Sequence, residues 1–365
     1  MIDHRLMPSL GAMLFVPTTI EKGAPGLIQI ANGIKFPNLR TVILDLEDSV
    51  KQDDVSRGMD NLRLALTEFS TASSVQVYVR ARDASNLSAL LQLPNIEKVH
   101  GFVLPKLDTT NVKDYFKRLP RNSNFAIMPI LETMETFSAD KLLRLRDILD
   151  GNNLYGPRVQ CILIGAMDLL KLLRIQPEIH DTIYDTVIAG VIDSIVLAFT
   201  PAGYKVSGTI YRGFGEELEA VLKREVMLDT KRGMFSKLAI HPNQIDVIEN
   251  GYAVTIKDLL RALVILAPDA PGVFKLFGEM VEPITQIEWA KRIFARVVRF
   301  GLMGGEVNAP GSNLNSRDLQ IEVRYADITI SWSQHWEPGS PDRLDSAPIA
   351  TYLEVLSMAD SLNLK

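Results

Sequence analysis

Ionisable side chains stand directly after most of the short apolar runs in this sequence. The second run finishes Leu44-Asp45-Leu46-Glu47-Asp48, and the fifth finishes Ile130-Leu131-Glu132. Charged groups are costly in the middle of a buried strand, and in a barrel of parallel strands the carboxyl ends meet at one face. Four further runs end in the same way, at Arg80, Lys106, Asp168 and His241. We therefore expect these side chains to share one site.

Two of the carboxylates suit a hard cation. Mg²⁺ is bound through one or two protein carboxylates and keeps its other positions for water and substrate oxygens, which fits Glu132 and Asp168 on adjacent runs; Mn²⁺ is a possible substitute. The histidines lack ligand spacing, which argues against zinc. Arg80 could clamp a substrate carboxylate with its planar guanidinium. A metal and an arginine facing a 2-oxo acid would stabilise an enolate, as breaking a carbon–carbon bond beside a carbonyl requires.

Simpler roles for the same residues stay open. Lys106 could form a Schiff base, although a carboxylate-bound metal would already supply the electron sink. Taken alone, Asp48 and Asp168 could cap the helices that follow them, and Glu132 could form a surface ion pair that contributes little. Cys161, inside an apolar run, is typical of a buried small side chain. Only the shared position at strand ends favours a catalytic site.

The apolar runs predict buried parallel strands, because they are continuous rather than alternating. Segments with helical spacing separate them, for example a stripe formed by Leu62, Leu66 and Phe69. Eight strand–helix units within about 240 residues have the size of a (β/α)₈ TIM barrel, and the glycine fingerprint of the rival open sheet is missing. The predicted strands are 12–16, 41–46, 75–79, 99–104, 126–131, 159–164, 207–210 and 237–240.

The pattern changes beyond residue 250. We divide the chain into a barrel that carries the active site, residues 1–250, and a mostly helical C-terminal extension, residues 251–365, which serves as a lid or an oligomerisation segment. Within the extension we expect helices at 255–266, 285–300 and 348–362, a flexible link at 304–313 and a strand at 328–332.

Composition excludes several classes of protein. The 365 residues carry 39 Lys plus Arg and 44 Asp plus Glu, a net charge of −5, so neither a nucleic acid nor an anionic membrane is expected as a partner. The sequence contains no run of about 18 uncharged apolar residues, so no membrane span is expected. A single cysteine excludes a disulfide framework, and the sequence begins without a signal-peptide pattern. These features predict a cytoplasmic protein.

Several motifs, in order along residues 10–300, resemble the citrate lyase beta-subunit-like group of the HpcH/HpaI aldolase superfamily. They include Leu14-Phe15-Val16-Pro17, Val103-Leu104-Pro105-Lys106 and Ile164-Gly165-Ala166-Met167-Asp168. The segments 43–50, 129–133, 237–245 and 288–292 continue the similarity. The opening Leu10-Gly11-Ala12 and the long tail resemble the branch called C–C bond lyases of the TIM-barrel fold, which is associated with tellurium-resistance gene clusters.

This resemblance implies an Mg²⁺-dependent lyase or aldolase that cleaves or forms a bond next to a 2-oxo acid, or its acyl thioester, through a metal-stabilised enolate. By motif match, Glu132 and Asp168 would bind the metal and Arg80 the substrate carboxylate. Three acids, Asp45, Glu47 and Asp48, would form a cluster that orders water, the arginine or a proton relay. Lys106 would support the site as their partner. The resemblance also implies a homo-oligomer, either a trimer or a hexamer.

The sequence departs from the family pattern where the seventh run ends. There Tyr211-Arg212-Gly213 stands where the family has an acidic residue. A basic side chain at this position favours a more anionic substrate. Because of this departure, no acyl carrier is assumed. Two other functions stay open. The site could serve phosphoenolpyruvate-type phosphoryl transfer, with Lys205, Lys231 and Arg232 nearby but no clear phosphate loop. Alternatively, the altered loops and the tail would suit a catalytically silent scaffold in a biosynthetic complex.

Overall fold

The computed structural model describes residues 3–6, 9–151, 154–308, 318–335, 351–362 and 364. The chain forms two compact units, one of Met1–Arg5 with Ser9–Gly251 and the other of Leu6–Pro8 with Tyr252–Lys365. Each unit has its own hydrophobic core.

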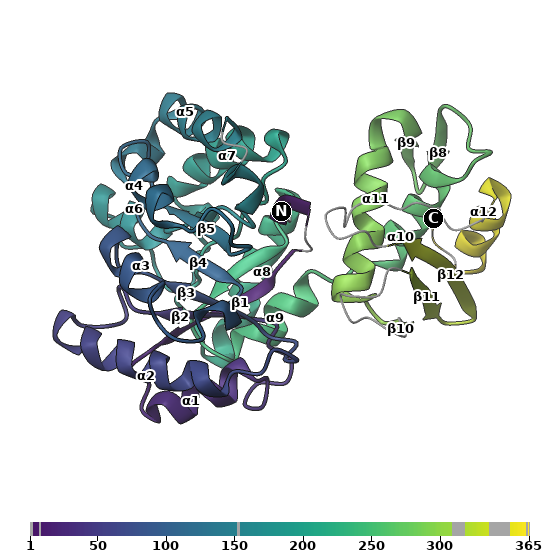
Figure 1. Cartoon of the computed structure of the whole chain (residues 1–365). Helices are drawn as coiled ribbons and strands as arrows, with labels where there is room; N and C mark the ends of the chain where they lie inside the picture. The colour runs from purple at the N-terminus through teal and green to yellow at the C-terminus, as the bar shows by residue number, and fades with distance from the viewer. Residues whose placement is uncertain are drawn as a thin grey trace. The chain divides into compact units, whose positions relative to one another are not determined.

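The first unit is built on a curled sheet of parallel strands (Figure 1). Its order is β6-β5-β4-β3-β2-β1-β7. Two isolated bridges, Ile162 with Val206 and Gly208 with Lys237, place residues 206–208 between β6 and β7 and close the ring at an eighth position. The named strands are β1 (Gly11–Pro17), β2 (Thr41–Asp45), β3 (Gln76–Arg80), β4 (Gly101–Leu104), β5 (Ala126–Leu131), β6 (Leu163–Ile164) and β7 (Ser236–Ala239). The predicted α/β class and TIM-barrel fold are confirmed.

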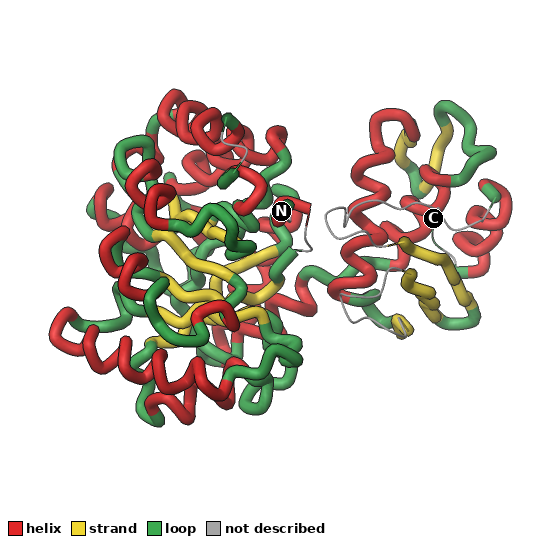
Figure 2. Tube along the Cα trace, viewed as in Figure 1, coloured by secondary structure: helices red, strands yellow, loops and turns green. Residues whose placement is uncertain are grey.

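Helices cover the outside of this sheet, as Figure 2 shows by the helical segments around the strands. One core cluster joins side chains from around the ring, including Ile43, Val103, Met128, Leu163 and Leu238. Their continuous burial explains why the sequence shows apolar runs rather than alternation. The helices are α1 (Gly23–Ala31), α2 (Val55–Glu68), α3 (Ala84–Leu90), α4 (Val112–Arg118), α5 (Ala139–Asp150), α6 (Ala166–Leu173), α7 (Ile188–Phe199), α8 (Glu219–Lys231) and α9 (Gln244–Gly251).

A buried ion cluster fastens α8 to the barrel. Lys237 of β7 is fully buried, and its Nζ lies 2.7 Å from Glu225 Oε1 and 3.1 Å from Asp229 Oδ2. Tyr184 donates a hydrogen bond to the other oxygen of Asp229. Gly208 is required beside this cluster, because a Cβ there would lie 2.4 Å from Asp229 Oδ2. Burial raises the pKa of Asp229 to about 6, although the charge of Lys237 opposes the shift.

The second unit mixes helices and strands. Helices α10 (Ile256–Leu266) and α11 (Pro283–Phe300) pack together, as the helical spacing predicts. A hairpin of β8 (Phe274–Leu276) and β9 (Glu279–Val281) and an antiparallel sheet of β10 (Glu306–Asn308), β11 (Asp318–Tyr325) and β12 (Ile328–His335) were mostly missed. The predicted link at 304–313 was wrong in part, because β10 pairs with β11; residues 309–313 lie outside the described residues.

The last helix of the described chain is α12 (Tyr352–Ser361). Thr351 caps it, with its side chain accepting from the Glu354 N–H while the Glu354 carboxylate accepts from the Thr351 N–H. The helix begins four residues later than predicted, and residues 348–350 lie outside the described part. Among the described helices, none combines the length and apolarity that crossing a bilayer requires.

Candidate active site

Arg80, at the end of β3, is the centre of an ion network at the carboxyl ends of the first strands. Its Nε and Nη2 donate to the two oxygens of Asp45, at the end of β2, over 2.6 and 2.7 Å. Its Nη1 lies 3.0 Å from Glu47 Oε2 and 3.3 Å from Asp48 Oδ2. The guanidinium also lies over the Phe15 ring, 4.8 Å from its centroid. All three nitrogens of Arg80 therefore face a carboxylate.

Asp45 is the most tightly held acid of this network. Besides the two bonds from Arg80, it accepts hydrogen bonds from the backbone N–H groups of Glu47 and Ser49 and from the Ser49 hydroxyl, the last over 2.5 Å. Burial raises the pKa of Asp45, but the hydrogen bonds and charge of Arg80 outweigh it, so that the net shift is downward. Asp45 is therefore a fixed anion that orients the arginine.

Lys106 connects the acidic cluster to the next strand. Its Nζ forms an ion pair with Glu47 Oε1 and lies 3.6 Å from Asp48 Oδ1. Its backbone has φ 51°, in the left-handed region that non-glycine residues rarely adopt. The backbone N–H donates to Glu132 Oε1 at 2.9 Å, and the carbonyl accepts from Asn111 Nδ2 at 2.7 Å. This unusual conformation aims the N–H of Lys106 at Glu132.

Glu132 follows β5 and is buried, with 4% of its surface exposed. Within the described chain, its single hydrogen bond is the one that Oε1 accepts from Lys106 N. Burial raises the pKa of Glu132 to about 8, and the negative charge of Asp168 adds to the shift. Gly165, after β6, makes room for this carboxylate, because a Cβ at that position would lie 1.9 Å from Glu132 Oε2.

Asp168 lies in the first turn of α6 and is partly exposed, with 22% of its side chain accessible. Its nearest ion-pair partner among the described residues is Lys171, at 3.9 Å on the exposed side of the same helix. Helix α6 has Gly165 as its N-cap residue and no side-chain cap, so Asp168, in its first turn, does not act as a helix cap. In the described chain, these two neighbouring acids thus keep oxygens without protein donors.

These carboxylates fit Mg²⁺ better than a metal held wholly by protein. No group of three or more His, Cys, Asp or Glu side chains within the described ranges could enclose a metal. Mg²⁺ needs only one or two carboxylates and completes its octahedron with water and ligand oxygens. A buried acid whose ionised form is disfavoured, beside a second acid, gains from a cation at that point. Glu132 and Asp168 are accordingly the residues that would hold the ion.

The structure therefore brings the seven predicted site residues to the same face of the barrel, in two connected groups. Asp45, Glu47 and Asp48 gather around Arg80, and the charges of Arg80 and Lys106 act on Glu132 together with that of Asp168. His241 stacks on Phe214 with 4.8 Å between ring centroids, and within the described residues no ion pair joins it to these groups. Cys161 is buried in the barrel core.

Sequence reasoning missed the residues that support the charged ones. Ser49 and Asn111 bind Asp45 and the Lys106 carbonyl, and Phe15 lies under Arg80. Arg82 stands in the charged end of the third run but was assigned no role. Its Nη1 donates to the carbonyls of Leu46, Glu47 and Val50 and so shapes the acidic loop. The one signal in the sequence was Gly165 between a strand and an acid, since a glycine there indicates a close approach.

The basic residues considered for phosphate lie elsewhere. Lys205 precedes the strand segment 206–208, and its Nζ bonds the carbonyl of Arg5. Lys231 and Arg232 end α8 and precede β7, and Arg232 pairs with Asp193 at 2.6 Å. Residues just before parallel strands lie at the amino ends of those strands, opposite the face that carries Glu132 and Asp168. They do not contribute to this site.

A family description confirms the class of protein that this barrel and its charged face define. A sequence model of the family "C-C bond lyase of the TIM-barrel fold" matches residues 4–302. The chain belongs to this family of carbon–carbon bond lyases. No curated protein matches the sequence significantly.

Solved structures share the fold at low sequence identity. The protein CitE from Mycobacterium tuberculosis, in complex with magnesium, acetoacetate and coenzyme A, is 21% identical with a TM-score of 0.58 over 79% of this chain and 98% of that chain. Haloferax volcanii malate synthase, in a magnesium/glyoxylate complex, is 15% identical with a TM-score of 0.56 over 66% and 74%. RipC from Yersinia pestis is 18% identical with a TM-score of 0.50 over 68% and 97%.

Proposed function

We propose that the protein is an Mg²⁺-dependent lyase or aldolase that cleaves or forms a carbon–carbon bond next to a 2-oxo acid, through an enolate of that acid. The observation that carries the proposal is the pair Glu132 and Asp168, two neighbouring acids with almost no donors in the described chain, beside the cationic Arg80 and Lys106. The magnesium complexes of the CitE and malate synthase structures support the choice of ion. The 2-oxo acid class is supported by the CitE complex with pyruvate.

Bound Mg²⁺ would supply positive charge next to the oxygen on which negative charge develops when the bond breaks. The chain supplies the rest. Glu132, fixed by Lys106 N–H and by the close approach of Gly165, holds its free oxygen in one place. Arg80, held in place by Asp45, adds a second cationic group, and groups that are fixed beforehand cost no reorganisation during the reaction.

Arg80 would reach a substrate carboxylate through Nη1. Its Nε and Nη2 are committed to buried Asp45. Nη1 lies 3.0 Å from Glu47 Oε2, an acid that Lys106 also holds, and 3.3 Å from Asp48, whose side chain is 55% exposed. A substrate carboxylate that replaces Asp48 would exchange one acid for another at the same nitrogen. Asp48 would then be released from Arg80, and Glu47 would remain paired with Lys106. Both acids would stand beside the substrate as groups that can accept a proton.

The proposal is tested with metal binding and turnover measured separately. Mn²⁺ is titrated into the protein and followed by electron paramagnetic resonance. Release of a 2-oxo acid from 4-hydroxy-2-oxo acids and from 3-carboxy-3-hydroxyacyl thioesters is followed with a coupled dehydrogenase. Glu132→Gln and Asp168→Asn each keep the side-chain shape and remove the charge. Loss of a direct ligand should weaken metal binding by about a hundredfold or more, above the range for supporting residues.

Glu135→Gln is the matched control. Glu135 lies three residues beyond Glu132, but it accepts hydrogen bonds from Thr109 and pairs with Lys141 at 2.9 Å. It should retain wild-type metal binding and turnover. If Glu132→Gln binds Mn²⁺ and turns over as well as the Glu135→Gln control, the metal assignment is wrong.

Several finer points are parts of this proposal. The acyl thioester remains an alternative form of the substrate, supported by the coenzyme A in the CitE complex. A cytoplasmic trimer or hexamer, with the chain beyond residue 250 as a lid or an oligomerisation segment, remains a prediction. The phosphoryl-transfer alternative is less favoured, because Lys205, Lys231 and Arg232 precede their strands rather than follow them.

A further inference from the structure

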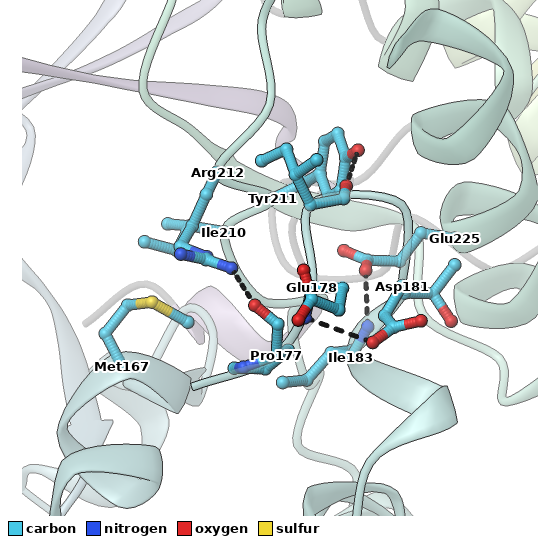
Figure 3. A pocket seen from close by; sticks show the side chains of 11 residues that line it. Met167, Pro177, Glu178, Asp181, Ile183, Ile210, Tyr211, Arg212 and Glu225 are labelled. Atoms are coloured by element: carbon cyan, nitrogen blue, oxygen red, sulfur yellow. Dashed lines mark hydrogen bonds between the residues drawn. The ribbon is translucent and has the colours of Figure 1, made fainter. Parts of the chain in front are cut away.

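Arg212 follows the seventh strand position of the barrel and points into a small pocket beside α6 (Figure 3). Its Nη2 donates to the carbonyl of Pro177 at 2.5 Å. Within the part of the chain that the structure describes, no carboxylate lies within ion-pair distance of its guanidinium. An arginine has five N–H donors, so most of the hydrogen-bonding capacity of Arg212 remains for a ligand.

The loop that carries Arg212 is rigid. Gln244, which is buried, donates from Nε2 to the carbonyls of the residues on either side of Arg212, to Tyr211 O at 2.9 Å and to Gly213 O at 2.7 Å. Its Oε1 accepts from Ile240 N at 2.9 Å, which ties the loop to the end of β7. Gly213 is required, because a Cβ would lie 2.6 Å from the Tyr211 ring. The position of Arg212 is therefore fixed before any ligand binds.

The pocket borders the helix that carries Asp168 of the proposed metal site. Met167, the residue before Asp168, lines it together with Arg212. Figure 3 shows these two side chains on one side of the pocket and Asp181 and Glu225 on the other. Its volume is about 20 Å³, room for about one water molecule, so it accepts the end of a ligand and not a whole one.

The acids of the pocket are already engaged and leave Arg212 available. Asp181 accepts from Glu178 N at 3.1 Å. Glu225 accepts from Ile183 N at 2.7 Å with one oxygen and pairs with Lys237 at 2.7 Å with the other. Glu178 is exposed to solvent, which screens its charge. A half-buried arginine on a rigid loop, with no acid of its own in the described chain, is the arrangement that binds a carboxylate from outside.

We propose that Arg212 binds a second anionic group at the far end of the substrate, so that the preferred 2-oxo acid carries a distal carboxylate. This inference rests on the proposed function, because the 2-oxo group would be held by Glu132, Asp168 and the ion between them. It explains why an arginine follows the seventh strand. Arg212 would determine specificity, whereas the metal-binding acids would determine whether a 2-oxo acid binds at all.

Two matched pairs of probes test the inference by calorimetry of the full chain in the presence of Mg²⁺. Oxaloacetate is compared with 2-oxobutyrate, and 2-oxoglutarate with 2-oxopentanoate; the members of each pair have the same carbon chain and differ in the distal carboxylate. We expect at least one diacid to bind about tenfold to a hundredfold more tightly than its partner, the range for a charge-assisted hydrogen bond. Arg212→Met should abolish that preference, and Arg212→Lys should keep part of it.

Arg224→Met is the matched control, because it removes a nearby arginine that pairs with Asp185 on the surface of α8. It should keep the wild-type preference, and Arg212→Met should unfold at the wild-type temperature. Equal binding of both members of each pair to the wild type, or an unchanged preference in Arg212→Met, overturns the inference and leaves the proposed function intact. If no 2-oxo acid binds in the presence of Mg²⁺, the proposed function fails and this inference fails with it.

Discussion

Replacing Gly165 by alanine should disable the site through a single methyl group. The new Cβ would lie 1.9 Å from Glu132 Oε2 and 2.6 Å from Glu132 Cβ, whereas ordinary contacts are 3.4–4 Å. The carboxylate must therefore move by about 1.5 Å. Rotation of the side chain cannot relieve the contact with Glu132 Cβ, so the loops after β5 and β6 must also separate. Overpacking of this kind costs about 1–3 kcal/mol of stability.

The effect on activity should exceed the effect on stability. A misplacement of about 1 Å reduces turnover by roughly a hundredfold, and Glu132 is the acid that the proposed mechanism depends on. The measurements are kcat/KM for release of the 2-oxo acid, Mn²⁺ affinity and the unfolding temperature. We expect a loss of about a hundredfold in kcat/KM, weaker metal binding, and a protein that remains folded.

Gly190→Ala provides the control for this prediction. Gly190 lies in α7, and a Cβ there meets no atom within 4 Å, so alanine should leave activity unchanged and stabilise the helix by about 0.5–1 kcal/mol. If Gly165→Ala retains the turnover and the metal affinity of the Gly190→Ala protein, then Glu132 is not held as the structure describes and the reasoning is refuted.

Three further predictions concern charged groups. Lys237→Met leaves Glu225 and Asp229 buried without their cation and should lower the free energy of unfolding by denaturant by about 3–5 kcal/mol. Lys223→Met, which breaks an exposed ion pair within α8, should cost less than about 1 kcal/mol. Equal losses would contradict the buried cluster. Because the pKa of Asp45 is lowered on folding, its contribution to stability is complete above about pH 4 and disappears as the pH falls through the folded value. In Asp45→Asn, the free energy of unfolding should therefore fall less steeply at acid pH. An unchanged acid dependence would count against the pair with Arg80. Asn111→Ala removes the bond that holds the Lys106 carbonyl and should lower kcat/KM about tenfold with little change in unfolding temperature; a wild-type kcat/KM would show that the backbone conformation of Lys106 does not matter.

Much of the barrel follows from the order of apolar runs. Seven of the eight predicted strands form named strands, because a strand covered on both faces must be apolar at every position, and that pattern is local in the sequence. The seventh was the exception. Residues 206–208 make only single bridges to Ile162 and Lys237, and Gly208 lies against a buried ion cluster in α8 that no local pattern reveals.

The strands of the second unit were harder to predict. Short hairpins such as β8 with β9 carry three residues a strand, too few to show a period. Helices α10 and α11 were found because 11 and 18 residues give several turns of an amphipathic stripe.

Sequence alone predicted that a particular set of charged side chains meets at one face of a barrel, because charged groups are excluded from buried strands and strand ends in a barrel meet. Only the tertiary structure decided their partners. Arg80 is surrounded by Asp45, Glu47 and Asp48, while Glu132 and Asp168 remain nearly without donors in the described chain. That division depends on side-chain directions set by long-range packing, such as the space that Gly165 leaves for Glu132 and the strained backbone of Lys106. The sequence shows that a glycine stands at position 165, but not which side chain it makes room for.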